Sequence, residues 1–454
     1  MSIQSLNPKN GVENGRYHLF DTDMIESVLE QSQSAFLRHK NTGFDSRTRQ
    51  ILAVADYLDE HAQDLGLMIT NEMGKLLSSA VAEVHKCAQL CRYYAENAEG
   101  ILGDQLIETN ARRSYVRYLP IGAILAVMPW NFPFWQVFRF AVPALMAGNV
   151  CLLKHASNVP ECALEIERIF NQCGFDNGEF QTLLIKSSQV ERVIADDRVR
   201  AVTLTGSEAA GSSVAAAAGK YLKKSVLELG GSDPFIVMPS ADFDQSIDLA
   251  VRGRVQNNGQ TCVASKRYII HADIYDAFKT ALVARYEALI VGDPCDKKTD
   301  IGPLSTHHIQ VELDIQVQET LNMGAARLCG AHIIESEGHY YQPGLLENIP
   351  KGSPAYDNEL FGPVGLLFKV ADLDEAIALA NDTRFGLGSV ICTQDKIEIE
   401  RAVNELDAGC TFVNALVASD ARLPFGGAKA SGYGRELSAE GIREFCNMKT
   451  IYIA

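Results

Sequence analysis

The chain has 454 residues, which is too many for one hydrophobic core, so we expect two or three lobes with room for a site between them. Its 41 Lys and Arg against 57 Asp and Glu give a net charge of −16, and no basic run stands out, so nucleic acid and anionic membranes are not expected as partners. No apolar stretch approaches the roughly 18 residues that a membrane span needs.

The N-terminal residues lack both the apolar core of a signal peptide and the Arg-rich pattern of a transit peptide, so we expect a cytoplasmic protein. The 11 cysteines are scattered along the chain, mostly among apolar neighbours, which is typical of reduced, buried thiols. Cys87 and Cys91 lie four positions apart in a helical pattern, but no second pair or histidine cluster accompanies them. We therefore expect no metal site.

The first hundred residues and the region after Gly122 have different patterns. From about Asp23 to Asn97, apolar residues recur at helical spacing, which predicts several long helices. After Gly122, short apolar runs alternate with helical segments, which predicts a parallel, doubly wound sheet. The candidate strands are 123–128, 150–153, 180–185, 201–205 and 226–229, and the candidate helices between them include 161–172 and 208–221.

A second alternation begins near Asp242, which is a candidate N-cap with Gln245 three residues later. The helix that it opens should end around 257–259, so Cys262 follows a helix C-terminus, where the dipole raises the pKa of a thiol. Further strand and helix signals run through 268–271, 274–289, 364–370 and 373–381. The apolar tail 449–454 is a candidate strand of the kind that pairs with another subunit.

The segments Glu228-Leu-Gly-Gly231 and Asn258-Gly-Gln-Thr-Cys262 together supply a general base, a glycine turn and a cysteine nucleophile. A cysteine adds to a carbonyl carbon, and a carboxylate activates water to release the acyl product. The pair therefore predicts acyl chemistry. The alternatives are an inert buried thiol at Cys262 and an exposed strand-end carboxylate at Glu228.

Six motifs in order make the chain similar to the aldehyde dehydrogenase superfamily. They are Pro129-Trp-Asn-Phe-Pro133, Thr205-Gly-Ser207, Glu228-Leu-Gly-Gly231, Asn258-Gly-Gln-Thr-Cys262, Glu359-Leu-Phe-Gly-Pro363, and Pro424-Phe-Gly-Gly427 with Ser431-Gly432. The resemblance covers essentially the whole chain and implies an α/β fold. It implies a Rossmann-like cofactor-binding domain (1–101 and 121–229), an α/β catalytic domain (230–435) and a small β oligomerisation flap (102–120 and 436–454), with a homodimer or homotetramer as the assembly.

The resemblance also implies a mechanism. Cys262 adds to the aldehyde to form a thiohemiacetal, whose oxyanion is bound by the Asn131 side chain and the Cys262 backbone N–H. Hydride transfer to the nicotinamide leaves a thioester, which water activated by Glu228 hydrolyses. Because the helix dipole does not favour the thiolate, we expect the nicotinium ring and Lys154 to do so. The alternative for Asn131 is a turn cap before the next helix.

The cofactor is expected where a strand ends and a helix begins, at Thr205, Gly206 and Ser207, because backbone N–H groups there can meet a pyrophosphate. By resemblance, Glu359, Phe361 and Trp130 hold the nicotinamide end.

Position 157 bears on the choice of cofactor. It is serine here, whereas many NAD-dependent relatives have a glutamate, whose charge would repel a 2′-phosphate. Ser157 and Lys154 therefore predict NADP, with NAD as the alternative if Ser157 only initiates the following helix.

The substrate is expected beside Trp135 and Arg139, which lie four apart on one helix face in the segment after Asn131. A cation in an aromatic tunnel favours a substrate with a distal carboxylate. The alternative is that Arg139 pairs with a structural acid. Ser419 and Phe425 are expected to complete the pocket.

This pattern resembles the NADP-using succinate semialdehyde dehydrogenases of bacteria. Glutarate semialdehyde, one methylene longer, and aliphatic aldehydes stay open as substrates. A CoA-acylating enzyme would have less need of Glu228, and a non-catalytic member would be expected to lose Cys262 or Glu228. A cysteine hydrolase would need a histidine base, and none of the 10 histidines lies in a recognisable partner motif.

Overall fold

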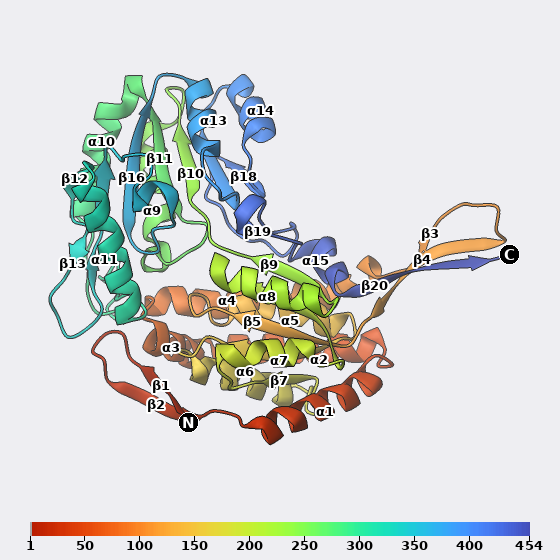
Figure 1. Ribbon diagram of the computed structural model, residues 1–454. Helices are drawn as coiled ribbons and strands as arrows, with labels where there is room; N and C mark the ends of the chain where they lie inside the picture. The colour runs from red at the N-terminus through yellow and green to blue at the C-terminus, as the bar shows by residue number, and fades with distance from the viewer. Residues whose placement is uncertain (1) are drawn as a thin grey trace.

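The computed structural model describes residues 2–454, and Figure 1 shows two lobes set at an angle with a narrow flap projecting from them. A hairpin of β1 (Ser2–Leu6) and β2 (Glu13–His18), which the sequence patterns did not predict, precedes the helices. The long helices predicted before Asn97 are confirmed as α1 (Thr22–His39), α2 (Phe44–Glu60), α3 (Ala62–Met73) and α4 (Leu77–Ile101).

The lower lobe in Figure 1 is built on a sheet with strand order β7-β6-β5-β8-β9-β19. All neighbours pair in parallel except β19 with β9. The strands are β5 (Ala123–Met128), β6 (Val150–His155), β7 (Phe180–Thr182), β8 (Val199–Thr205), β9 (Lys224–Glu228) and β19 (Gly432–Tyr433), and the helices between them are α5 (Trp135–Met146), α6 (Pro160–Gln172), α7 (Val190–Ala195) and α8 (Glu208–Lys220). The parallel, doubly wound prediction is confirmed, although β7 is shorter than the 180–185 that the pattern indicated.

The chain order in this sheet reverses at β5, because β6 and β7 lie on one side and β8 and β9 on the other. Ligands of open α/β sheets bind at such a reversal, outside the carboxyl ends of the strands. Met128 of β5, Thr205 of β8 and Glu228 of β9 are the strand ends at this edge. Each of them directly precedes or belongs to a predicted site motif.

The upper lobe is built on a second sheet with strand order β12-β15-β16-β11-β10-β17-β18. Its strands are β10 (Asp233–Val237), β11 (Ser265–His271), β12 (Ala326–Cys329), β15 (Gly344–Glu347), β16 (Val364–Val370), β17 (Gly388–Cys392) and β18 (Cys410–Val413), and a small hairpin adds β13 (His332–Ile333) and β14 (Tyr341–Gln342). Its helices are α9 (Phe243–Val255), α10 (Ala272–Glu287), α11 (His307–Asn322), α12 (Pro354–Asp357), α13 (Leu373–Asn381) and α14 (Lys396–Glu405). The predicted cap is confirmed, because the Asp242 carboxylate accepts a hydrogen bond from the Gln245 N–H.

The flap consists of β3 (Gln105–Leu106), β4 (Arg113–Pro120) and the C-terminal β20 (Cys446–Ile453), which follows α15 (Ser438–Glu444). The predicted terminal strand is thus present, and it pairs antiparallel with β4 of its own chain. Because β4 lies between β3 and β20, the outer edge of β20 has no strand partner among residues 2–454. Met448 and Tyr452 on β20 are 67% and 60% exposed, so a face of the flap is open to another subunit. The domain boundaries stay a prediction.

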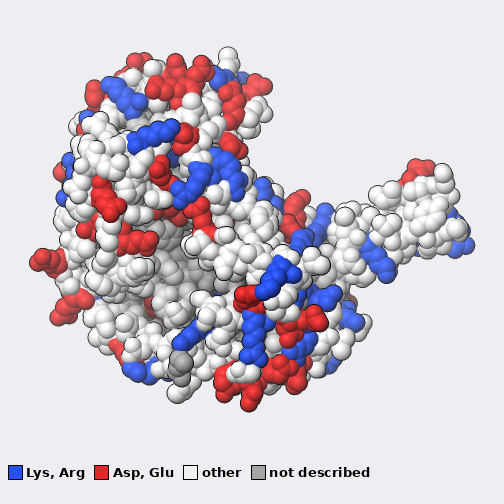
Figure 2. Space-filling view, in the orientation of Figure 1, with Lys and Arg blue, Asp and Glu red and all other residues white. Residues whose placement is uncertain are grey.

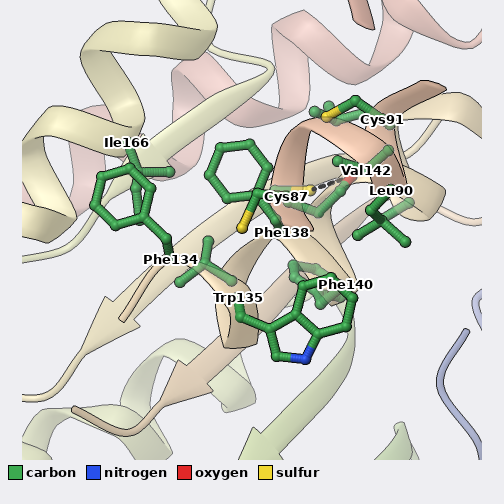
Figure 3. Packing of buried hydrophobic residues seen from close by; sticks show 14 of the residues in the cluster. Cys87, Leu90, Cys91, Phe134, Trp135, Phe138, Phe140, Val142 and Ile166 are labelled. Carbon is green, nitrogen blue, oxygen red and sulfur yellow. Dashed lines mark hydrogen bonds between the residues drawn. The ribbon is translucent and has the colours of Figure 1, made fainter. Parts of the chain in front are cut away.

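The core of the lower lobe packs α4 and α5 together. Figure 3 shows Cys87 and Cys91 beside Phe138 and Leu90, and both cysteines are fully buried in this apolar cluster.

Within residues 2–454 no group of three or more His, Cys, Asp or Glu side chains is placed to hold a metal ion. No helix in that range is long and apolar enough to cross a membrane. On the face seen in Figure 2, acidic and basic side chains are interspersed.

Candidate active site

Cys262 lies where a larger and a smaller cavity meet. The larger cavity, of about 560 Å³, is lined by strand ends of the lower lobe and by α11. The smaller one, of about 280 Å³, lies between α4, α5 and the segment 417–425. Cys262 and Gln136 line both cavities. The structure therefore separates the surroundings of the thiol into two compartments, each large enough for part of a small ligand.

A tight turn holds the thiol between them. Helix α9 ends at Val255, and Asn257 and Asn258 then adopt left-handed backbone conformations with φ of 54° and 57°. Gly259 follows with φ of 75°, and a Cβ there would lie 2.5 Å from the Gly362 carbonyl carbon, so only glycine fits. The prediction that Cys262 follows a helix C-terminus is confirmed.

Burial raises the pKa of the Cys262 thiol to about 12, because desolvation disfavours the thiolate. The positive charges of Lys266 and Arg139 act in the opposite direction. Lys154, which we expected to favour the thiolate, is not among the charges that act most strongly on it. Its own side chain is buried on β6, where desolvation lowers its pKa, so its expected effect on the thiol is not supported.

Lys266 is a site residue that the motifs missed. Its ammonium donates hydrogen bonds to the Cys262 carbonyl at 2.6 Å and the Thr261 carbonyl at 3.0 Å, and it pairs with the Glu359 carboxylate at 2.8 Å. Lys266 therefore connects the turn between α9 and Cys262 to Glu359, a residue that we predicted to hold the cofactor. The only available signal was a lysine four positions after Cys262, and no local periodicity marks that spacing as a contact.

Glu228 ends β9 at the boundary of the larger cavity, where Cys262 also lies. Both carboxylate oxygens are buried and accept no hydrogen bond from any residue that the structure describes. Burial, and then the charge of Glu436, raise the pKa of Glu228 well above its usual value. A carboxylate with a raised pKa is a stronger general base near neutral pH. Gly426 packs against it, since a Cβ at Gly426 would lie 2.7 Å from Glu228 Oε1.

Asn131 lines the larger cavity with Glu228 and Cys262, and it is 4% exposed. Its side-chain amide donates one hydrogen bond to the Gln260 carbonyl at 3.0 Å. The Asn257 side chain donates to the Asn131 backbone carbonyl at 2.8 Å, so the segment after β5 is fastened to the cysteine turn. An amide nitrogen carries two N–H groups, and the second is free to bind an oxyanion.

Most of the predicted cofactor residues lie together along the larger cavity, which is lined by Trp130, Thr205, Gly206, Ser207, Glu359 and Phe361, whereas Lys154 and Ser157 are not among its lining residues. The Ser207 hydroxyl caps α8 by accepting from the Ala210 N–H at 3.3 Å, so the N-terminus of this helix opens into the cavity. Trp130 and Phe361 meet edge to face with centroids 5.7 Å apart, which forms an aromatic wall. These are the groups that a dinucleotide needs: donors for phosphate and an apolar wall for a ring.

Ser157 lies on the turn between β6 and α6 and is exposed. The alternative that it initiates α6 is wrong, because Val159 is the N-cap residue and the buried Glu72 carboxylate accepts the N–H groups of Glu161 and Cys162 at 3.0 and 2.9 Å. The Ser157 hydroxyl makes no hydrogen bond to another described residue. It is therefore free to donate to a ligand.

Trp135, Arg139, Ser419 and Phe425 line the smaller cavity, so the structure brings the predicted substrate residues together beside Cys262. Arg139, however, forms a buried ion pair with Glu436 through its Nε group. Its Nη2 group donates a hydrogen bond to the Thr205 hydroxyl at 3.3 Å. This is the pairing with an acid that the sequence left as the alternative. Glu436 was missed because it is far from Arg139 in the chain and belongs to none of the motifs.

Two lysines of the smaller cavity were also missed. Lys75 pairs with Glu83, whose other oxygen accepts the N–H groups of Phe134 and Trp135 at 2.9 Å each and thereby caps α5. Lys86 on α4 donates to the Ser419 hydroxyl at 2.8 Å. Both lie in a helix-rich region where lysines are ordinarily solvated, so the sequence carried no signal that Lys75 is buried or that Lys86 lines the cavity.

The sequence model of the aldehyde dehydrogenase family matches residues 1–451. Over the full length of both chains, the protein is 50% identical to succinate-semialdehyde dehydrogenase [NADP(+)] 1 of Mycobacterium tuberculosis. It is 48% identical, again over both full lengths, to a probable succinate-semialdehyde dehydrogenase [NADP(+)] of Synechocystis sp..

Among solved structures, the chain superposes on succinic semialdehyde dehydrogenase from Streptococcus pyogenes in complex with NADP+ with a TM-score of 0.97. The two are 37% identical, and the match covers 99% of each chain. The protein Gox0499 gives a TM-score of 0.98 at 37% identity with 100% of both chains covered. Fold and sequence comparisons therefore lead to the same family.

Proposed function

Because the chain belongs to the aldehyde dehydrogenase family, we propose that it oxidises succinate semialdehyde to succinate with NADP. The observation that carries this proposal is the position of Cys262 at the meeting point of the two cavities, with Glu228 and Asn131 beside it in the larger one. The full-length similarity to NADP-dependent succinate-semialdehyde dehydrogenases supports the substrate and the cofactor.

The residues of this chain account for the first half of the reaction. The Cys262 sulfur adds to the aldehyde carbon and forms a thiohemiacetal. The free amide N–H of Asn131 and the backbone N–H of Cys262 stabilise the oxyanion. Both groups are held in place before the reaction by the hydrogen bonds that join Asn131 to Asn257 and Gln260. Loss of hydride from the tetrahedral carbon then leaves a thioester on Cys262.

Hydrolysis of the thioester is the role of Glu228. Its unbonded carboxylate can take a proton from water, which attacks the thioester and releases the carboxylic acid and the thiol. An acyl transfer to CoA would have less need of this base. The presence of an unpaired, buried carboxylate beside the thiol therefore favours hydrolysis.

The residues along the larger cavity fit a dinucleotide cofactor, and when bound, NADP supplies the hydride acceptor and a positive charge. Ser207 and the N-terminus of α8 would hold the pyrophosphate, and Glu359 with the Trp130 and Phe361 wall would hold the nicotinamide end. The free hydroxyl of Ser157 would donate to the 2′-phosphate. Since the pKa of Cys262 in the free protein is about 12, the thiol is protonated at neutral pH until a further positive charge arrives.

The assembly belongs to the same proposal. No described strand of the chain pairs with the outer edge of β20, and its Met448 and Tyr452 are exposed, which supports a homodimer or homotetramer built through the flap. The cysteines in residues 2–454 are all free thiols, in keeping with the reducing cytoplasm that we expect as its location.

The test is NADPH formation by the purified protein with a panel of aldehydes and both nicotinamide cofactors. The panel contains succinate semialdehyde, glutarate semialdehyde and butanal. We expect the highest kcat/KM for succinate semialdehyde with NADP. A higher kcat/KM for either of the other aldehydes would overturn the substrate, a preference for NAD would overturn the cofactor, and no reduced cofactor with any pair would overturn the reaction.

A further inference from the structure

The smaller cavity is lined by more basic side chains than acidic ones. Its lining includes Lys75, Lys86 and Arg139 against one carboxylate, Glu83. Lys75 is neutralised by Glu83, and Arg139 is neutralised by Glu436. Among the described residues that line this cavity, Lys86 is the one lysine or arginine without a carboxylate partner.

The surroundings of Lys86 direct its charge into the cavity. Its ammonium lies 4.0 Å from the Trp135 ring centroid and donates one hydrogen bond to the Ser419 hydroxyl. An ammonium has three N–H donors, so at least one remains for a ligand. The Ser419 hydroxyl accepts from Lys86 and therefore keeps its own O–H to donate.

A further donor in the cavity lining has no partner. The Trp135 indole N–H is buried and makes no hydrogen bond to any residue in the described range. Buried donors are nearly always satisfied, so an unsatisfied one beside a cavity indicates a ligand that brings an acceptor. Lys86, Ser419 and Trp135 thus offer donors from α4, from the segment 417–425 and from α5.

We propose that Lys86, with the Ser419 hydroxyl, is the site that binds the distal carboxylate of the substrate while Cys262, which lines the same cavity, engages the aldehyde. This rests on the proposed function. Arg139, which the sequence predicted to bind the distal carboxylate, then has a different role. Its charge balances Glu436 beside the base Glu228, so its removal affects every aldehyde alike.

The charge of Lys86 depends on pH. Burial, and then the charge of Arg139, lower the pKa of Lys86 to about 8. Glu83 and Cys87 on α4 and Asp420 on the segment 417–425 act in the opposite direction. A bound carboxylate favours the charged form, so binding becomes weaker as the pH rises above about 8 and Lys86 loses its proton. An uncharged aldehyde has no such dependence.

The test compares succinate semialdehyde with butanal, which has the same chain length without the carboxylate, in the wild-type protein and Lys86→Met with NADP. Methionine keeps the apolar stem over Trp135 and removes the charge. A charge-assisted hydrogen bond is worth about 10- to 100-fold in binding, so kcat/KM for succinate semialdehyde should fall by that factor, mainly through KM. For butanal, kcat/KM should change less than about twofold. Equal losses for both aldehydes would show a structural role, and no loss for succinate semialdehyde would place the anchor elsewhere; either result overturns the proposal.

Lys86→Arg is the matched control because its charge does not titrate in this range. We expect the ratio of kcat/KM for the two aldehydes to fall above pH 8 in the wild-type protein and to stay level in Lys86→Arg. A fall of the same size in both proteins would contradict the role of Lys86. The ratio cancels the titration of groups that act on the chemistry, such as Cys262 and Glu228.

Calorimetric titration with succinate separates this proposal from the proposed function, since it needs no turnover. We expect succinate to bind the wild-type protein and to bind Lys86→Met about 10- to 100-fold more weakly. Equal affinity, or no binding to the wild-type protein, would overturn the anchor. If succinate binds through Lys86 but succinate semialdehyde is not oxidised, the proposed function fails and the anion site stands.

Discussion

The two cavities beside Cys262 are built in different ways. The larger one takes its binding groups from strand ends and turns, at Thr205, Gly206 and Ser207 and on the aromatic wall of Trp130. The smaller one takes them from charged side chains of separate helices: Arg139 is paired with Glu436, whereas Lys86 donates to the neutral Ser419 hydroxyl. Ligand binding in the larger cavity therefore depends on local backbone geometry, whereas ligand binding in the smaller cavity depends on which charged side chains are neutralised by a partner.

The largest expected effect is at Cys262, which lines both cavities. Cys262→Ala should lower kcat by roughly 10,000-fold or more, because no other nucleophile is available at that position. Binding of NADP and of succinate, measured by calorimetry, should change less than about threefold, since the two cavities keep their linings. Retention of substantial activity would show that the thiol is not the nucleophile, and loss of both bindings would show that the cavities depend on each other.

A smaller effect is expected at the base. Glu228→Gln should lower steady-state turnover by about 100- to 1,000-fold, because an amide cannot take the proton from water. The first turnover should still produce one equivalent of NADPH per site, visible as a rapid burst in stopped-flow absorbance. If the burst disappears together with the steady state, Glu228 acts before the thioester forms.

The cofactor side can be changed alone. Ser157→Glu should lower the ratio of kcat/KM for NADP to that for NAD by about 10- to 100-fold, because a carboxylate repels the 2′-phosphate and accepts from a ribose hydroxyl. KM for succinate semialdehyde at saturating cofactor should stay within about twofold. Ser336→Glu, which adds the same charge at an exposed position that lines neither cavity, is the control. An unchanged ratio in Ser157→Glu would remove Ser157 from cofactor choice.

The smallest expected effect concerns the charge balance near Glu228. The pKa of Glu228 is raised by burial first and by the charge of Glu436 second, and it is lowered by Arg139. Glu436→Gln removes a negative charge and leaves Arg139 unpaired, so the pKa of Glu228 falls. The rate rises with pH as Glu228 loses its proton, so the acidic limb of the rate profile should move to lower pH by about one unit. Glu440→Gln, at an exposed position on α15, is the control and should leave the acidic limb of the rate profile unchanged. If the acidic limb moves in neither variant, Glu436 does not act on the pKa of Glu228.

The cofactor side and the thiol could be predicted from the sequence because each of their motifs is a short run of neighbouring residues. The turn that ends α9 and the strand end before Ser207 are local features, and the resemblance to a known family connects the motifs that lie far apart in the chain. The pairing of Arg139 with Glu436 was not predictable, since the two residues lie on segments that only tertiary folding brings together. Lys86 and Lys266 were missed for the same reason: a lysine in a helix or beside a turn is ordinarily solvated, and only the structure shows that Lys86 lines a cavity and that Lys266 is buried.

The most direct test of the account is the acyl intermediate on Cys262. Glu228→Gln should be mixed with succinate semialdehyde and NADP, quenched in acid and analysed by mass spectrometry of the intact protein and its peptides. We predict a succinyl thioester on the peptide that contains Cys262, and we predict that it is absent when NADP is omitted. An acyl group on another cysteine, or no acyl group while NADPH is formed, would contradict the account.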